Sequence, residues 1–381
     1  MNILYIEQSI PPYLGGIERV TWTNAQSLKK AGHDVFFAYN LHDYDEVDKE
    51  HKIKLDYSVR EEIFIQFLFV FIVKNEIDII INQDIYNKKL RKTFEVLKSH
   101  SICKIINCFH LSPDFLDYSC DNQKTIKHKL KDFFLKLLEG LDAYSYDIKS
   151  MYNVVDAFVL LSESFKDSFS KRYKLKDLNK LYTIGNPLSF DRFFQLDEIS
   201  LKKRKVLIVT RFFEKQKNIC SALRIWGEIE KDGYSEWELV IAGYGQDEKR
   251  IKDYAKALQI KRVKFMGKVL DPQKLYEEAS IFMMTSKYEG FGMTLTEASQ
   301  FGCVPVAFDN FSVLHDILTN EENGFIIPSD DEKKFKEVLE ELMDNSNMRY
   351  KVANRAISNS KRFAVDKICE QWLVLIKKLQ S

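Results

Sequence analysis

Short apolar runs alternate with amphipathic stretches along the first half of the chain. A strand is predicted at Ile3 to Ile6, then a loop with prolines and glycines, a helix from Ile17 to Lys30, and a second strand from Asp34 to Ala38. This order of elements is a βαβ unit. Further apolar runs of strand length, separated by helical stretches, are Ile77 to Ile81, Lys104 to Cys108 and Ala157 to Leu161. The first half is therefore predicted to be a Rossmann-like domain, in which helices cover both faces of a mostly parallel sheet.

The same alternation starts again after a polar stretch. The pattern breaks near Pro187, and residues 188–204 show no clear period, so we expect a linker there. New strands are predicted at Lys205 to Thr210, Trp237 to Ala242, Val263 to Met266, Ile281 to Met284 and Val304 to Phe308. The last stretch, Val365 to Leu379, has apolar residues at helical spacing.

The fold class that follows is α/β, with two Rossmann-like domains. We expect residues 1–187 and 205–362 to form the two domains, and residues 363–381 to form a helix that packs back on the first domain. Two such domains facing each other leave a cleft at the carboxyl ends of both sheets, where ligands bind in sheets of this kind.

Composition narrows the class of protein. In 381 residues the hydrophobic share is 45%, the charged share is 30%, and the formal net charge is +1, as in a soluble globular protein with no general attraction to nucleic acid. The six cysteines are scattered without a CxxC pair, which argues against a zinc site or a disulfide framework and favours the cytoplasm. The first residues lack a basic region followed by a long apolar stretch, so no signal peptide is predicted.

Two segments bear on membrane contact. The apolar run from Ile63 to Val73 is shorter than the roughly 20 residues that a spanning helix needs, and we predict a buried helix rather than a membrane segment. Lys124 to Leu138 combines apolar residues at helical spacing with five lysines, a pattern typical of a basic amphipathic helix that lies on an anionic membrane surface. An ordinary surface helix remains the alternative for this second segment.

The strongest candidate site follows the predicted strand Ile281 to Met284. Glu289 and Glu297 flank two glycines there, and a helix is predicted to begin near Met293. Glycines let the backbone approach a ligand, and the free N–H groups of a helix start suit phosphate. Two carboxylates can accept hydrogen bonds from the hydroxyls of a sugar and a ribose. The simpler alternative is a capped loop-helix junction. The loop residues expected to line the site are Gly290, Phe291, Gly292, Met293 and Thr294.

Basic residues follow the first strand of the second domain. Arg211, Lys215 and Lys217 come directly after the predicted strand, and Asn218 is a candidate helix N-cap. Cations at this position suit a diphosphate, whose charge must be stabilised when it departs as a leaving group. Gly243, in a Gly-x-Gly turn after another strand, is a weaker candidate for the same site.

The first domain offers two candidates of its own. Gly15 and Gly16 lie in the loop between the first strand and the first helix, where bulky side chains would keep a ligand away. His110 ends the apolar run that starts at Lys104, so it falls at the carboxyl end of a strand, where it can hydrogen-bond a sugar hydroxyl. A plain turn and a structural histidine are the alternatives.

Taken together, these motifs resemble those of the retaining GT-B glycosyltransferases in glycosyltransferase family 4 (glycosyl transferases group 1), which includes many bacterial polysaccharide and lipopolysaccharide enzymes. Glu289 and Glu297 look like the family's two glutamates separated by seven residues, which implies that the first contacts the donor sugar and the second the ribose. Arg211 and Lys217 resemble the basic pair that holds the diphosphate. The stretch around Met266 is similar to the one that cradles the base.

The resemblance extends to the first domain, where Gly15 and Gly16 match the glycine loop and His110 resembles the donor-side histidine. It implies transfer of a hexose or N-acetylhexosamine from a nucleoside diphosphate sugar, UDP-linked, with retention of configuration and no obligatory metal or other cofactor. Glu289, His110, Arg211 and Lys217 would then be catalytic. The implied acceptor is a saccharide or lipid-linked glycan, bound by the first domain, in bacterial surface glycan synthesis.

The function and the place in the cell stay open at this point. A sugar-nucleotide epimerase and a non-catalytic GT-B partner subunit remain alternatives to the transferase. A place in the cytoplasm is expected, with peripheral contact at the inner face of the cell membrane if Lys124 to Leu138 binds lipid.

Overall fold

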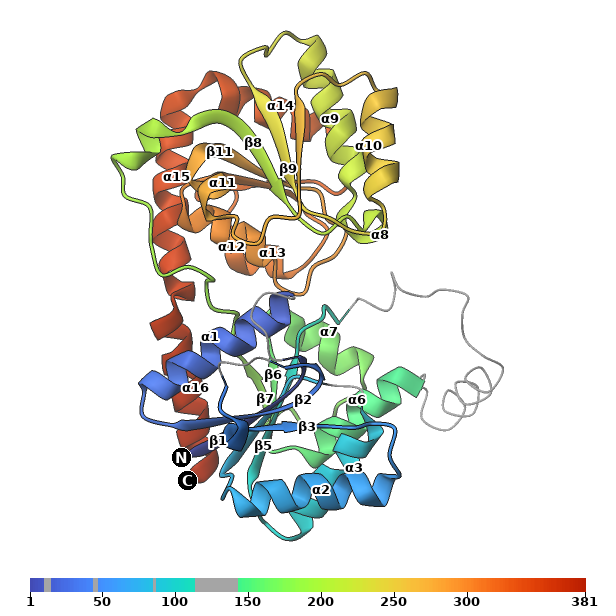
Figure 1. Ribbon diagram of the computed structural model, residues 1–381. Helices are drawn as coiled ribbons and strands as arrows, with labels where there is room; N and C mark the ends of the chain where they lie inside the picture. The colour runs from blue at the N-terminus through green and yellow to red at the C-terminus, as the bar shows by residue number, and fades with distance from the viewer. Residues whose placement is uncertain (10–14, 44–46, 85–86, 114–142) are drawn as a thin grey trace. The chain divides into compact units, whose positions relative to one another are not determined.

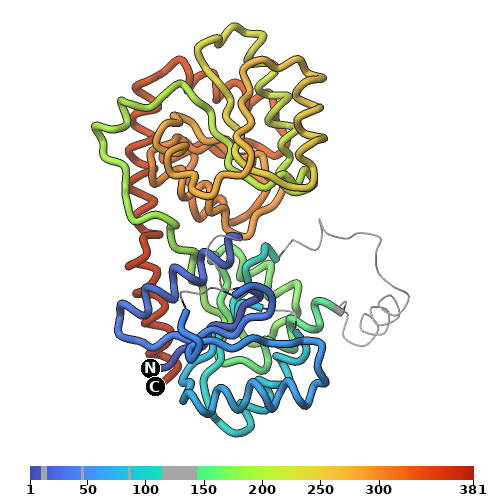
Figure 2. The backbone as a smooth tube through the Cα atoms, viewed as in Figure 1, coloured from blue at the N-terminus to red at the C-terminus, as the bar shows by residue number. Residues whose placement is uncertain are grey.

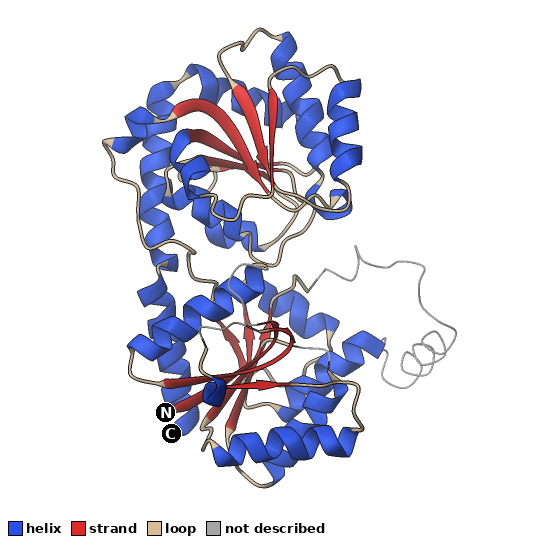
Figure 3. Ribbon diagram, viewed as in Figure 1, coloured by secondary structure: helices blue, strands red, loops and turns tan. Residues whose placement is uncertain are grey.

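The computed structural model describes residues 1–9, 15–43, 47–84, 87–113 and 143–381 (Figure 1). The chain divides into two compact units, the first made of Met1–Pro187 with Val365–Ser381 and the second of Leu188–Ala364. Each unit holds one parallel sheet between helices (Figure 3). The predicted α/β class with two Rossmann-like units is therefore confirmed.

The sheet of the first unit has the strand order β3-β2-β1-β4-β5-β6-β7, and neighbouring strands pair in parallel. Its strands are β1 (Asn2–Ser9), β2 (Asp34–His42), β3 (Lys52–Lys54), β4 (Ile79–Asn82), β5 (Lys104–Phe109), β6 (Ala157–Leu160) and β7 (Leu181–Thr183). Strands β1, β4, β5 and β6 lie within two or three residues of the runs read from the sequence. The short strands β3 and β7 were not predicted, because three residues are too few to show a period.

Among the described residues before Pro187, the helices are α1 (Gly16–Lys30), α2 (Glu61–Lys74), α3 (Lys88–Ser99), α6 (Ala143–Val154), α7 (Phe165–Arg172) and the short η1 (Lys49–His51). The last helix, α16 (Val365–Gln380), buries Ile368, Trp372 and Ile376 in one apolar cluster with β1. Both ends of the chain therefore lie within the first unit (Figure 2).

Helix α2 is the helix expected from the apolar run, but only one of its faces is buried. Phe64, Leu68 and Ile72, spaced four residues apart, pack inside the unit. The opposite face exposes four large apolar side chains: Ile63 (46%), Phe67 (50%), Val70 (56%) and Val73 (47%). The prediction of a buried helix was wrong for this face, because α2 lies at the surface and packs inward on a single side.

No helix among the described residues is both long enough and apolar enough to cross a bilayer. The basic amphipathic helix predicted at Lys124 to Leu138 lies outside the described residues.

The sheet of the second unit has the order β10-β9-β8-β11-β12-β13, again with parallel pairing. Its strands are β8 (Lys203–Val209), β9 (Glu238–Ala242), β10 (Val263–Gly267), β11 (Ala279–Met284), β12 (Val304–Phe308) and β13 (Phe325–Ile327). The helices are α8 (Glu214–Lys217), α9 (Ile219–Lys231), α10 (Glu248–Ala257), α11 (Gln273–Glu278), α12 (Met293–Gln300), α13 (Val313–Ile317), α14 (Glu332–Asp344) and α15 (Ser346–Ser360), with the short η2 (Glu198–Leu201) and η3 (Lys361–Phe363). All residues of β11 and β12 are buried, so these strands form the centre of the unit.

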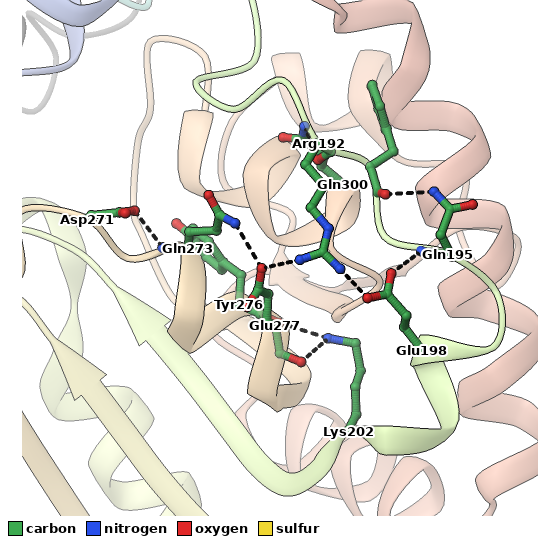
Figure 4. Close-up of polar contacts among 10 residues, drawn as sticks. Arg192, Gln195, Glu198, Lys202, Asp271, Gln273, Tyr276, Glu277 and Gln300 are labelled. Atoms are coloured by element: carbon green, nitrogen blue, oxygen red, sulfur yellow. Dashed lines mark hydrogen bonds and ion pairs between the residues drawn. The ribbon is translucent and has the colours of Figure 1, made fainter.

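The stretch expected as a linker, residues 188–204, is packed against the second unit. The Gln300 side chain donates to the carbonyls of Phe190 (2.6 Å) and Arg192 (2.8 Å). Arg192 in turn donates to Glu277 on α11 at 2.8 Å and also pairs with Glu198 (Figure 4). These contacts join the segment to α11 and α12, and they depend on tertiary packing that has no sequence period.

Lys202 ends this segment with a buried ammonium group. Its Nζ donates to the carbonyls of Tyr276 at 2.8 Å and Glu277 at 3.3 Å (Figure 4). It also donates to the carbonyl of Ala279 at 2.8 Å. Burial lowers the pKa of Lys202. The carbonyls at the end of α11 thus receive hydrogen bonds from a side chain, which satisfies groups that a helix end leaves unpaired.

Candidate functional site

The candidate site of the second unit lies where the strand order of its sheet reverses. β8 has β9 on one side and β11 on the other. The chain therefore runs toward one edge of the sheet after β8 and toward the opposite edge after β11. The loops that follow such a switch point diverge and leave room for a ligand. The basic residues follow β8 and the glutamate loop follows β11, as the sequence predicted.

The two loops are joined by hydrogen bonds. The N–H of Lys287 donates to the carbonyl of Gln216 at 2.8 Å, and the Gln216 side chain donates to the carbonyl of Tyr288 at 3.1 Å. The Thr285 hydroxyl donates to the carbonyl of Asn218 at 3.0 Å. The loop after β8 is therefore held in fixed register against the loop after β11.

Asn218 occupies the N-cap position of α9 in a left-handed conformation, with φ of 50°, but its side chain does not cap the helix. Glu214 does so instead, because its carboxylate accepts from the N–H of Cys220 at 3.1 and 3.2 Å. The capping role predicted for Asn218 was wrong. The tight turn of α8 brings Glu214 back over the start of α9.

Lys217 and Glu289 form the central ion pair of the site. Lys217 Nζ lies 2.6 Å from Glu289 Oε1, and the two side chains are 13% and 10% exposed. The sequence predicted that Lys217 holds a diphosphate and that Glu289 contacts a sugar. The structure brings both residues together, and in it they bind each other.

Arg211 and Lys215 belong to the same cluster. Both are exposed. Burial raises the pKa of the Tyr288 hydroxyl, and the positive charges of Lys215 and Arg211 act in the opposite direction. Both cations lie in the loop after β8, which Gln216 joins to the loop after β11 at Lys287 and Tyr288.

The loop that carries Glu289 leads directly into the start of α12. Gly292 precedes the helix with φ of 83°, a conformation that side chains disfavour, and no side chain caps the helix in the described structure. Met293 and Thr294 in the first turn are partly exposed. Phe291 points into the core instead, where its ring meets that of Phe363 edge-on at 5.5 Å. The helix start thus presents N–H groups and its positive dipole end.

Glu297 is buried, with 2% of its surface exposed. The Tyr276 hydroxyl donates to its Oε2 at 2.8 Å, and the Ser189 hydroxyl donates to its Oε1. The carboxylate therefore anchors the chain entering the unit, a packing role that the sequence did not indicate. Its predicted contact with a ribose stays a prediction.

Gly243 has a structural reason to be glycine. Its φ is 151°, and a Cβ atom there would lie 1.7 Å from the carbonyl oxygen of Thr210. The close approach lets the loop after β9 bond to the loop after β8, since the N–H of Phe212 donates to the carbonyl of Tyr244 at 2.8 Å. Met266, predicted to lie near a base, is 38% exposed beside the left-handed Gly267.

In the first unit, the candidate residues lie at the carboxyl ends of β1 and β5. Gly15 is the N-cap of α1 and Gly16 its first residue. His110 follows β5, where its Nε2 bonds to Gln83 Oε1, and burial lowers its pKa to about 4. The imidazole is therefore neutral near pH 7. Its Nδ1 is buried and has no hydrogen-bond partner among the described residues.

Polar groups that sequence reasoning missed lie at the ends of β1 and β4. Glu7 is 5% exposed, and burial raises the pKa of its carboxyl well above the usual value. Asp84 accepts a hydrogen bond from the Tyr57 hydroxyl at 3.0 Å. An acidic residue directly after the apolar run Ile3 to Ile6, as at Glu7, was the signal available in the sequence.

A protein-family model matches most of the second unit. Residues 190–361 match the family model described as glycosyl transferases group 1. The second unit is a glycosyl transferases group 1 domain. The match begins inside the segment expected as a linker, in agreement with the packing of that segment on the group 1 domain.

Relatives extend the similarity beyond the group 1 domain. An uncharacterized glycosyltransferase of Haemophilus influenzae is 25% identical over 371 residues, which cover 94% of this chain and 95% of the relative. A second relative, from Campylobacter jejuni, is named GalNAc-alpha-(1->4)-GalNAc-alpha-(1->3)-diNAcBac-PP-undecaprenol alpha-1,4-N-acetyl-D-galactosaminyltransferase. It is 29% identical over 233 residues, 60% of this chain and 62% of its own.

Among solved structures, Anabaena HepE in complex with UDP and glucose matches with a TM-score of 0.74 at 15% identity, covering 99% of this chain and all of that one (100%). The resemblance to GT-B glycosyltransferases is confirmed for the group 1 domain and for the fold. Membership of glycosyltransferase family 4, retention of configuration and the roles of single residues in the group 1 domain stay predictions.

Proposed function

We propose that the protein transfers a hexose or N-acetylhexosamine from a UDP-linked sugar to a saccharide or lipid-linked acceptor in bacterial surface glycan synthesis. One observation carries the proposal. Lys217 and Glu289 meet at the switch point of the group 1 domain, where the loop after β8 also carries Arg211 and Lys215 and the loop after β11 leads to the uncapped start of α12. Several cations and a helix N-terminus match the charge of a departing diphosphate.

The choice of donor and acceptor draws on what similar proteins bind. HepE is bound to UDP and glucose, which supports a UDP-sugar donor. The Campylobacter relative is named for an acceptor linked to undecaprenol through a diphosphate, which supports a lipid-linked glycan as acceptor. The donor contacts we assign are to Arg211, Lys217 and Glu289, with the first turn of α12 at the phosphates.

The proposed reaction takes place on one face of the donor sugar. The acceptor hydroxyl oxygen forms a bond to the anomeric carbon as the bond from that carbon to the phosphate oxygen breaks. The proton of the hydroxyl passes to the departing phosphate, so that the nucleoside diphosphate leaves with it. Arg211, Lys217 and the N–H groups near Met293 stabilise the charge that develops on this phosphate. No metal is assigned a role.

His110 of the first unit has the chemistry to position a substrate hydroxyl. A neutral imidazole whose Nε2 donates to Gln83 keeps the lone pair of Nδ1 for a hydroxyl donor. We therefore assign His110 to a hydroxyl of the donor or acceptor, with Gly15 and Gly16 giving backbone access at the end of β1.

The test combines binding with turnover. The chain is screened by thermal shift against UDP, GDP and their common sugars, because a bound ligand raises the melting temperature by mass action. The donor that binds is then incubated with saccharide and polyprenyl-diphosphate-linked acceptors, and the anomeric configuration of the product is read by NMR. An α-linked product from an α-linked donor is expected. Epimerised donor formed without an acceptor would point to the epimerase, and a chain that neither binds nor transfers would point to the partner subunit.

A matched pair of variants tests the site. Arg211→Ala is expected to reduce transfer by about 100-fold, the effect of losing one charged contact to a transition state. Lys249→Ala removes a cation of the same domain that is 92% exposed, and it should leave the rate unchanged. Equal rates for the two variants would contradict the assignment of Arg211.

A further inference from the structure

The group 1 domain has a cavity of about 310 Å³ at the edge of its sheet that lies away from Lys217 and Glu289. The residues that line it include Lys202, Ser280 and Gly302, which lie within two residues of the starts of β8, β11 and β12. Lys217 and Glu289 instead follow the last residues of β8 and β11. Because a ligand at a switch point binds outside the carboxyl ends of the strands, the cavity at the amino ends is a separate place on the domain.

Lys202 brings a buried positive charge to this cavity. Its Nζ bonds to backbone carbonyls, which satisfy its N–H groups but do not neutralise the charge. Burial lowers the pKa of Lys202, and the opposing effects include those of Glu277 and Glu198. Both of these acids pair with Arg192. Among the described residues, the ammonium group therefore has no carboxylate of its own.

Arg349 brings a second cation, which the end of α14 holds in place. Its Nη1 donates to the carbonyls of Leu342 and Met343, and its guanidinium group lies over the ring of Trp237 at 5.2 Å. Burial lowers the pKa of Arg349, and the charge of Asp344 acts in the opposite direction without forming an ion pair with it. Nε and Nη2 have no hydrogen-bond partner among the described residues. Arg349 is thus fixed in position with N–H groups left for a ligand.

The first turn of α15 lies at the rim of the same cavity. Asn345 caps the helix by accepting from the N–H of Met348 at 2.9 Å. The backbone N–H groups of Ser346 and Asn347, which line the cavity and are exposed, donate to no other group in the described parts of the chain. The positive end of the helix dipole adds to their attraction for an anion.

The cavity therefore offers two cations and unpaired N–H groups, and none of the described residues that line it is acidic. This chemistry suits a phosphate monoester, which carries nearly two negative charges at neutral pH. Ile199 and Ala353 add apolar lining, which a bare phosphate would leave uncovered. Ligand cavities typically measure about 300–1,000 Å³, so this one has the size for a small ester rather than for a nucleotide sugar.

We propose that this cavity binds a small phosphate monoester. Nε and Nη2 of Arg349 and the first N–H groups of α15 donate to the phosphate oxygens, and the charge of Lys202 adds attraction. The carbon skeleton lies toward Ile199 and Ala353. This site goes beyond the reaction under Proposed function, since it needs neither the donor nor the acceptor.

The experiment is calorimetry of the full chain at constant ionic strength, without donor or acceptor. The probes are glycerol 3-phosphate and ribose 5-phosphate, and the comparison ligands are glycerol, ribose and inorganic phosphate. We expect both esters to bind, the two neutral compounds not to bind, and inorganic phosphate to bind about tenfold more weakly, because it lacks the carbon skeleton. Inorganic phosphate that binds as tightly as the esters would indicate an adventitious ion only and would overturn the proposal, as would the absence of ester binding.

Asn347 provides a variant that separates binding from folding. Asn347→Asp adds a negative charge at the rim with a side chain of the same size, and it should weaken ester binding by about tenfold or more. Its melting temperature should stay the same or rise, because an acid is favourable in the first turn of a helix. Asn347→Ala adds no charge and should keep most of the affinity. Unchanged binding by Asn347→Asp, or binding that Lys217→Met abolishes, would place the ester at another site and contradict the proposal.

Two further pairs of variants test the proposed donors. Arg349→Gln should bind the esters about tenfold more weakly, the scale of one charged hydrogen bond. Arg355→Gln, which removes an exposed cation of the same helix that does not line the cavity, should bind like the wild type. Ser346→Pro removes the N–H at the first position of α15, where proline fits, and Ser346→Ala keeps it. Equal ester affinity of the proline and alanine variants would exclude this N–H from the site and refute the assigned contacts.

Discussion

The ion pair between Lys217 and Glu289 gives the most direct test of the donor site. A diphosphate and the sugar attached to it would need Lys217 and Glu289 respectively, yet the two side chains bond to each other at 2.6 Å. A donor must therefore separate the pair before it gains both contacts. The two substitutions Lys217→Met and Glu289→Gln are expected to act differently on UDP, which carries the diphosphate but no sugar.

The magnitude follows from the burial of the pair. Removing one partner of a fully buried pair costs about 3–5 kcal/mol, and exposed pairs are worth about 0–1 kcal/mol. At 13% and 10% exposure the pair lies nearer the buried limit, so Lys217→Met should lower the unfolding free energy of the group 1 domain by about 2–3 kcal/mol. The double variant should lose less than the sum of the single ones, with a coupling of about 1–2 kcal/mol.

Two assays check this reasoning. Urea denaturation of the ligand-free variants gives the coupling, and calorimetry gives their affinity for UDP. Lys217→Met should weaken UDP binding by about 2 kcal/mol, the scale of one charged hydrogen bond. Glu289→Gln should bind UDP at least as tightly as the wild type, because Lys217 no longer has a charged competitor, and it should lose transfer. Zero coupling, or weaker UDP binding by Glu289→Gln, would refute the idea that Lys217 leaves Glu289 to bind the diphosphate.

Three further predictions concern stability. Because burial lowers the pKa of His110 to about 4, the unfolded chain takes up a proton near pH 6.5 that the native state does not. Stability should be complete above pH 6.5 and fall by about 3 kcal/mol as pH is lowered toward 4, and His110→Asn should flatten this part of a denaturation profile. Lys202→Met, which leaves three buried carbonyls without their donor, should cost about 2–3 kcal/mol in urea denaturation, and a loss below 0.5 kcal/mol would contradict its assigned role. Gly243→Ala should cost more than about 3 kcal/mol, because its Cβ would lie 1.7 Å from Thr210, whereas Gly233→Ala, with φ of 98° but open space, should cost about 1–2 kcal/mol. Similar melting temperatures for these two glycine variants would contradict the steric argument.

The alternation of strands and helices was predictable from the sequence because long buried strands appear as distinct apolar runs. β12 is Val304–Phe308, the same bounds as the predicted run, and β5 differs by a single residue at its end. Short strands such as β3 contain too few residues to appear as such runs. Residues 188–204 were expected to form a linker because their contacts, such as those of Lys202 with backbone carbonyls, have no period along the chain.

Helix α2 shows a different limit of sequence reasoning. A run that is apolar on all sides predicts burial on all sides, since exposed apolar area is unfavourable in water. The structure buries Phe64 and leaves Phe67 half exposed, so this apolar run is buried on one face only. Hydrophobicity alone could not show this, because it is the same for a helix buried on all sides and for a helix buried on one side.

The candidate site was predicted in outline because charged and glycine residues directly after buried strands are conspicuous in a sequence. The loops after β8 and β11 bring together residues that the sequence named, among them Lys217 and Glu289. The buried acids of the first unit were missed, since Glu7 is a single acid directly after an apolar run. The prediction that Gly16 and His110 join the residues of the group 1 domain around one donor stays a prediction.

The two glutamates of the motif are also not equivalent as probes of function. Glu297 accepts hydrogen bonds from Tyr276 and from Ser189, and thereby fixes the chain that enters the group 1 domain. A substitution of Glu297 that weakened nucleotide binding would not separate a lost ribose contact from a shifted α12, because the same carboxylate serves packing. Glu289 has its charged partner within the site, and that partner is the residue expected at the diphosphate. The opposite effects predicted for Glu289→Gln and Lys217→Met on UDP affinity cannot both arise from a general loosening of the domain, and this pair therefore decides between a binding site and a structural ion pair.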